Sequence, residues 1–135
     1  MLLPRGIMIA LVNGERFEFY RNDGTETEPR LEAISTPDFE LHNKGAGVRH
    51  KVSPANPSAT QLDEDAHAAA VAKWLNSMAL DHAIDRLVIA AAPRTLGELR
   101  RHYHGTLKSC LVAELDKDLV GRPTEAVVTA LRAEP

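Results

Sequence analysis

The sequence predicts a single α/β domain built on a five-stranded mixed sheet. Two continuous apolar runs, residues 7–12 and 87–92, have the length and branched side chains of strands buried on both faces. Helical patterns separate the later strand-like segments, whereas only short turns separate the first three. A chain of 135 residues can bury one hydrophobic core and is too short for two ordinary domains, so we expect one domain over residues 1–135.

The composition narrows the class of protein. Hydrophobic residues make up 44% and charged residues 26%, the usual balance of a packed globular chain. A formal net charge of -3 argues against a protein that coats itself with nucleic acid, although it allows a local basic patch. The one cysteine, Cys110, fits a reducing compartment, and we see neither a targeting segment nor a membrane span. We therefore expect a cytoplasmic protein; the sequence leaves its oligomeric state open.

Three strand-like segments open the chain as an antiparallel meander. Residues 7–12 end at an Asn-Gly pair, the strongest short-range signal of a hairpin, and a second run occupies residues 17–20. Residues 22–24, Asn-Asp-Gly, mark the next turn. Apolar and polar side chains then alternate over residues 30–36 until Pro37 ends the strand.

Periodicity disappears over residues 38–59, a stretch punctuated by Gly and Pro. Loops of about twenty residues are unusual in compact domains and are often functional or disordered. We expect a mobile loop that folds over the carboxyl end of the fourth strand, beside Arg94, where Arg49, His50 and Lys51 would add positive charge. The alternative is a long, solvated crossover.

A first helix follows the loop. Ser58 or Thr60 could open it as part of a capping box, and residues 81–82 should end it. Apolar residues at positions 71, 74, 75 and 78 have the spacing of a buried helical face. Trp74 could stack on a ligand, but its place in this stripe favours the core.

The fourth strand, residues 87–92, is closed by Pro93. Thr95 and Glu98 have capping-box spacing and predict the start of a second helix, which should end near Gly105. The remaining elements are a fifth strand over residues 110–115 and a third helix over residues 124–131.

The resulting element order is βββαβαβα. Helical crossovers favour parallel pairing of strands one, four and five, while the first three strands pair antiparallel. The simplest solution is the strand order 3-2-1-4-5 with helices on both faces, which is the order of the ribonuclease H-like fold.

Three segments resemble the bacterial host attachment protein family. They are residues 3–6 leading into residues 12–14, residues 92–100 (APRTLGELR) and residues 112–119 (VAELDKDL). The resemblance implies a role in attachment to host cells. It also implies a distant similarity to the middle domain of archaeal and eukaryotic class-1 release factors, and so a link to the ribosome.

This chain departs from the relatives that it resembles at two points. The release-factor middle domain carries a Gly-Gly-Gln tripeptide for peptidyl-tRNA hydrolysis, and no Gly-Gly-Gln occurs here. The host attachment family commonly has an acidic residue where Asn13 stands. The resemblance therefore implies neither release activity nor a role for a carboxylate at that turn.

The basic segment over residues 94–108 is the best site candidate, because a helix should start there directly after a buried strand. Ligands of open α/β sheets bind at the carboxyl ends of strands, and a helix N-terminus with an adjacent Arg attracts phosphate or carboxylate. We predict an anion or RNA site that includes Arg94, Thr95, Arg101 and His104. The alternative is that Thr95 only caps the helix and the arginines form its solvated face.

The sequence predicts neither a metal nor a cofactor. His102 and His104 are one residue apart and would point in different directions on a helix, and the other histidines show no zinc-binding pattern. Ribonuclease H-type catalysis normally needs a carboxylate in the first strand, and residues 7–12 contain none.

Three functions remain open. The favoured hypothesis is a non-enzymatic binding protein that contacts RNA or the ribosome through the basic helix start. The second is a regulator of host attachment or surface polysaccharide that acts through protein partners. The third is a small hydrolase of an RNA or aminoacyl ester, with His104 or His50 as base and Arg94 as anion clamp.

Overall fold

The computed structural model describes residues 1–39 and 57–135, and its five strands form one mixed sheet. The predicted loop position beside Arg94, with Arg49, His50 and Lys51, lies outside the described residues. The strands run in the order β3-β2-β1-β4-β5. Their bounds are Met8–Val12 for β1, Phe17–Asn22 for β2, Leu31–Ala33 for β3, Leu87–Ala91 for β4 and Leu111–Leu115 for β5.

The strand directions agree with the predicted topology. β1 pairs antiparallel with β2 and parallel with β4, β2 pairs antiparallel with β3, and β4 pairs parallel with β5. The predicted α/β class and the order 3-2-1-4-5 are therefore confirmed. The carboxyl ends of β1, β4 and β5 consequently meet at one edge of the sheet.

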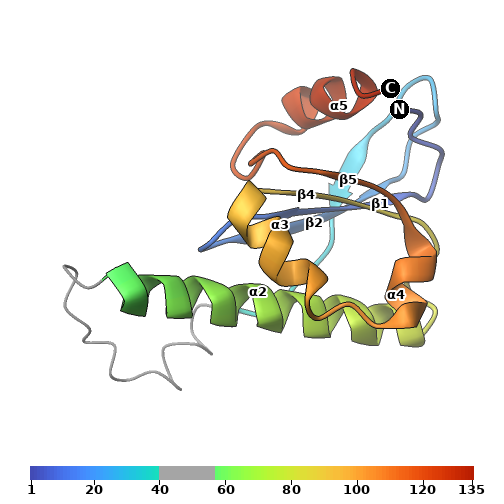
Figure 1. The fold of residues 1–135 in the computed structure, drawn as a ribbon. Coiled ribbons are helices and arrows are strands. Elements are labelled where there is room, and N and C mark those ends of the chain that lie inside the picture. The colour runs from blue at the N-terminus through green and yellow to red at the C-terminus, as the bar shows by residue number, and fades with distance from the viewer. Residues whose placement is uncertain (40–56) are drawn as a thin grey trace.

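Four helices occur in the described residues and cover both faces of the sheet (Figure 1). The longest, α2, packs against α3 and α4 on one side, while α5 lies on the other side. Their bounds are Pro57–Leu80 for α2, Pro93–Arg100 for α3, Gly105–Cys110 for α4 and Thr124–Arg132 for α5.

The central strand β1 contributes to both hydrophobic clusters because its side chains alternate between faces. Ala10 and Val12 belong to the cluster that includes α2, whereas Ile9 and Leu11 belong to the cluster that includes α5. All five residues of β1 are buried, as the continuous apolar run predicts. The core thus holds β1 rigidly and fixes the turn at its carboxyl end.

The starts of the helices differ from the predictions. α2 begins at Pro57, ahead of both predicted cap residues. α3 begins at Pro93, and its N-cap residue, Ala92, makes no side-chain hydrogen bond. The prediction that Thr95 and Glu98 form a capping box at the helix start is therefore wrong. Proline suits the first helical position because its fixed φ matches a helix and its missing N–H would have no intrahelical partner. Thr95 consequently lies inside the helix, where it is 7% exposed.

Gly105 begins a helix rather than ending one. The short α4 was not predicted, and it makes the order of elements in the described residues βββαβααβα. Because Cys110 belongs to α4, the fifth strand starts at Leu111. The third strand is also shorter than predicted, Leu31–Ala33 rather than residues 30–36.

Candidate functional site

Asn13 organises the edge of the sheet where the parallel strands end. Its Oδ1 accepts hydrogen bonds from the backbone N–H groups of Glu15 at 3.0 Å and Arg16 at 2.8 Å, which closes the hairpin after β1. Its Nδ2 donates to the carboxylate of Asp118 at 3.3 Å, and Asp118 in turn accepts from the N–H of Val120. One amide therefore ties the β1–β2 turn to the segment after β5.

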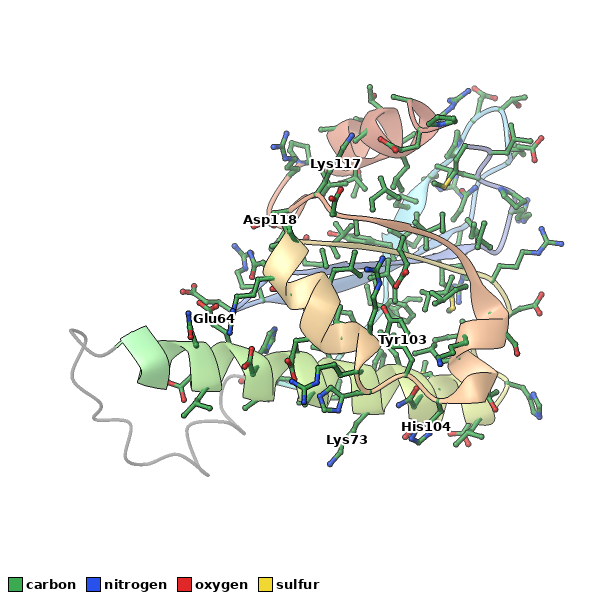
Figure 2. The ribbon with its side chains drawn as sticks, viewed as in Figure 1. Glu64, Lys73, Tyr103, His104, Lys117 and Asp118 are labelled. Carbon is green, nitrogen blue, oxygen red and sulfur yellow. The ribbon has the colours of Figure 1, made fainter. Side chains whose placement is uncertain are left out.

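Carboxylates surround the start of α3. Arg94 lies 3.5 Å from Asp65 of α2, and its side chain is 54% exposed. Glu64 packs against the hairpin so closely that a Cβ added at Gly14 would lie 2.7 Å from its Cδ. Figure 2 labels Glu64 and Asp118, which belong to this edge. An incoming anion would therefore have to compete with nearby negative charge for Arg94.

Arg100 and Tyr103 join α3 to the edge strand β5 through Glu114. Arg100 lies 3.0 Å from one oxygen of Glu114, and the Tyr103 hydroxyl donates to the other oxygen at 2.8 Å. Burial, and then the bond to Glu114, raises the pKa of Tyr103 well above its ordinary value. The bond to Glu114 also raises the pKa of Arg100. This triad fixes α3 on the sheet and keeps Arg100 engaged.

Asn76 holds the turn between α3 and α4. Its Nδ2 donates to the carbonyl oxygen of His102 at 2.8 Å, and its Oδ1 accepts from the N–H of His104 at 3.0 Å. Glu98 adds contacts at 3.4 Å to Arg101 and at 3.1 Å to His102. Arg101 nevertheless keeps 73% of its side chain exposed.

The predicted anion site is divided between the two ends of α3. Arg94 contacts Asp65 of α2, whereas the backbone of His104 contacts Asn76 of the same helix. With a rise of 1.5 Å per residue, these two positions on α2 are roughly 16 Å apart. Arg94 and Thr95 therefore lie at the sheet edge, and Arg101 and His104 lie at the far end of α3.

Sequence reasoning missed the acidic partners of the basic segment. The spacing of Glu98 to Arg101 and to His102 is i,i+3 and i,i+4, which favours contact on a helix and could have indicated these pairs. Asp65 and Glu114 come from distant parts of the chain, and no local pattern indicates them.

Two classes of feature are absent from the part of the chain that the structure describes. Residues 1–39 and 57–135 contain no group of three or more His, Cys, Asp or Glu side chains that could hold a metal ion. Within the same ranges, no helix is both long and apolar enough to cross a membrane.

Comparison with known proteins supports one part of the resemblance. The family model described as Bacterial archaeo-eukaryotic release factor family 12 matches residues 6–131, a span that includes all the described strands and nearly all of the last helix. The match confirms the release-factor similarity; it carries no host attachment name. No curated protein matches the sequence.

Proposed function

The chain belongs to bacterial archaeo-eukaryotic release factor family 12, and from this membership we propose that it is a non-enzymatic binding protein that associates with the ribosome through RNA. The family match over residues 6–131 carries the proposal. It fits the absence of a Gly-Gly-Gln tripeptide from the sequence, because binding does not need the group that hydrolyses peptidyl-tRNA.

The basic groups at the far end of α3 are the best candidates for contact with phosphate. We call Arg101, His104 and Lys108 the α3–α4 basic surface; all three are exposed. Arg101 shares the Glu98 carboxylate with His102, while the side chains of His104 and Lys108 make no ion pair with any described residue. Exposed cations of this kind supply the salt-sensitive part of RNA binding.

Arg94 is a second candidate contact, at the sheet edge. Its exposed guanidinium lies 3.5 Å from Asp65, which is longer than the distances in a strong bidentate ion pair. A phosphate can therefore replace Asp65 as the partner of Arg94. Thr95 contributes to the packing of α3 more than to a surface contact, because it is buried. Residues Arg49, His50 and Lys51 remain proposed contacts that lie outside the described residues.

The separation of Arg94 from His104 favours binding over ester hydrolysis. The positions on α2 that they contact are roughly 16 Å apart, too far for both groups to act on one small ester. A hydrolase with Arg94 as anion clamp and His104 as base needs both groups on the same substrate, so this geometry supports that version less. The alternative base, His50, lies outside the described residues.

Sedimentation with ribosomes tests the proposal. The full chain should move with ribosomes in a sucrose gradient at low salt and return to the top as salt rises. Arg101→Ala should weaken retention and lower the salt dependence by about one phosphate contact. Protein that stays at the top of the gradient at every salt concentration would refute ribosome association.

Arg30 provides a matched control for Arg101. Its side chain is 68% exposed and lies 3.6 Å from Glu32, whereas Arg101 is 73% exposed and lies 3.4 Å from Glu98. Arg30→Ala removes the same charge beside the edge strand β3. Equal loss of retention in both variants would show that net charge, not the α3–α4 basic surface, controls binding.

The host attachment resemblance supplies a second proposal, regulation of attachment or surface polysaccharide through protein partners. Its support is the likeness of residues 92–100 and 112–119 to that family. A deletion strain that attaches normally would refute it. If attachment is lost, complementation with Arg101→Ala separates the proposals, because full rescue by a variant whose ribosome retention is weakened would place attachment on a protein partner.

A further inference from the structure

A shallow cavity of about 530 Å³ lies on the side of the molecule formed by α2 and the segment after β3. Pro37, Asp38 and Phe39 contribute one wall, and Lys73, Trp74 and Ser77 of α2 contribute the other. None of these residues belongs to the α3–α4 basic surface. The cavity is therefore a separate feature of the described residues.

The cavity opens on the main aromatic cluster of the protein. The chain contains only three Phe and one Trp, and all four are in this cluster. The Trp74 ring lies 5.6 Å from Phe17 and 5.3 Å from Phe19, both at near-perpendicular angles, and Phe17 lies 6.0 Å from Phe39. Phe19 is 2% exposed and anchors the group in the core. Trp74 is thus half-buried: it packs against the core and also forms a rigid wall of the cavity.

Lys73 and Ser77 place polar donors next to this aromatic wall. They are four residues apart on α2 and so lie on the same side of the helix. Lys73 is exposed and forms no ion pair with any described residue, and in Figure 2 its side chain extends away from the ribbon into solvent. An ammonium group and a hydroxyl group beside an aromatic wall suit a planar ring that carries a negative group.

We propose that this cavity binds one nucleotide of a single-stranded RNA, with the base against Trp74 and the phosphate at Lys73 and Ser77. Asp38 also lines the cavity, on the wall of residues 37–39. The phosphate belongs at the α2 wall, where Lys73 and Ser77 supply a positive charge and a hydroxyl donor, and the base lies toward residues 37–39. The inference takes RNA as the partner class from the proposed function and adds a second contact surface to it.

Trp74 makes the site directly measurable, because it is the only tryptophan in the chain. Titration of the full chain with short single-stranded oligonucleotides of A or U should quench its fluorescence to saturation, less so at high salt. Lys73→Ala should weaken this binding roughly tenfold, as expected for the loss of one charge-assisted contact. Inorganic phosphate alone should not quench, because it supplies no ring to stack.

Lys117→Ala is the control for Lys73→Ala. Lys117 is also an exposed lysine, it pairs with Glu134 at 2.7 Å, and it lies outside both the cavity and the α3–α4 basic surface. Its loss should leave the quenching titration close to that of the unchanged protein. Equal weakening by both variants would overturn the site in favour of a diffuse charge effect.

A second pair of variants tests the ring itself. Trp74→Phe keeps an aromatic wall and should retain binding of a labelled oligonucleotide, measured by polarisation. Trp74→Leu keeps an apolar side chain without a ring and should lose most of it. If the two variants fold, as judged by circular dichroism, but bind equally, stacking on Trp74 is refuted. Quenching by a Leu- and Phe-rich peptide but not by RNA would also overturn the proposal and make the cavity a peptide site.

The two proposals fail in different ways. Ribosome sedimentation without quenching of Trp74 by any RNA would refute the cavity and leave ribosome association standing. Saturable quenching that Lys73→Ala weakens, without sedimentation at any salt concentration, would support the cavity and refute ribosome association.

Discussion

Two asparagines close the two turns of the β1–β2–β3 meander, and they differ mainly in burial. Asn22 ends β2 with its side chain fully buried. Its Oδ1 accepts from the N–H groups of Gly24 at 2.8 Å and Arg30 at 2.9 Å, and its Nδ2 donates to the carbonyl oxygen of Leu3 at 2.8 Å. Asn22 therefore joins the chain before β1, the turn and the start of β3.

Asn13 makes a similar pattern at the other end of the meander, but water reaches it. It also accepts from two backbone N–H groups, and its amide donates to Asp118 instead of a buried carbonyl. If Asn13 is removed, water can replace its bonds; if Asn22 is removed, buried groups are left unpaired. The number of hydrogen bonds is thus a poor guide to stability, because burial determines how much each bond contributes to the free energy of unfolding.

The largest effect that we expect tests this comparison directly. Asn22→Ala leaves three backbone groups without their buried partner and should lower the free energy of unfolding by about 3 kcal/mol. Asn13→Ala should lower it by less than about 1 kcal/mol. Urea unfolding of both variants measures the difference, and equal losses would break the comparison.

Asn76 is buried like Asn22, with 3% of its surface exposed, but it bridges two helical segments, α2 and the α3–α4 turn. Asn76→Ala should lower the free energy of unfolding by about 2 kcal/mol, because it leaves the His102 carbonyl and the His104 N–H unpaired. It should also reduce ribosome retention, since the turn positions Arg101. Retention equal to that of the unchanged protein, with the loss of stability present, would show that the turn does not position the contact.

Tyr103 adds a dependence on pH. Tyr103→Phe removes the bond to Glu114 and should lower the free energy of unfolding by about 1 kcal/mol at neutral pH. The folded-state pKa of Tyr103 lies above its unfolded value of about 10, so its contribution is complete below that pH and declines as pH rises above it. The unchanged protein should therefore lose stability above about pH 10 more steeply than the variant. Parallel curves above that pH would contradict the raised pKa.

The smallest effect that we expect comes from a charge placed at Asn13, which is half-buried. Asn13→Asp keeps the two backbone acceptor bonds but places a carboxylate beside Asp118, which should lower the free energy of unfolding by about 0.5 kcal/mol. Added salt should remove most of that loss, because exposed charges are screened. A loss of unfolding free energy that does not change with salt would contradict the solvent access of residue 13.

Local patterns predicted the sheet well because each central strand can be recognised from its own residues. The apolar runs of β1 and β4 and the Asn-Gly turn are contiguous in the chain, and crossover handedness then fixes the order of strands. The prediction that Gly105 ends a helix was wrong, although glycine commonly does so. Here α4 begins at Gly105, directly after the bond from the His104 N–H to Asn76. Local signals cannot show a contact between residues that are far apart in sequence.

The candidate site was predicted less well for the same reason. The cluster of cations in residues 94–108 is visible in the sequence, but the carboxylates that face Arg94 and Arg100 come from α2 and β5. Trp74 was expected in the core, and it is half-buried against the core. Its second role as a cavity wall depends on residues 37–39, which no helical pattern connects to it.

The central position of β1 has a consequence for how the chain folds. β1 precedes in the chain both helices that cover it: α2 covers one of its faces, and α5, the last of the described elements, covers the other. Until α5 emerges, residues 7–12 present an uncharged, β-prone run with an uncovered face, the kind of segment that pairs between chains and aggregates. Folding intermediates that lack α5 should therefore depend on chaperones, and a low protein concentration should favour refolding over aggregation.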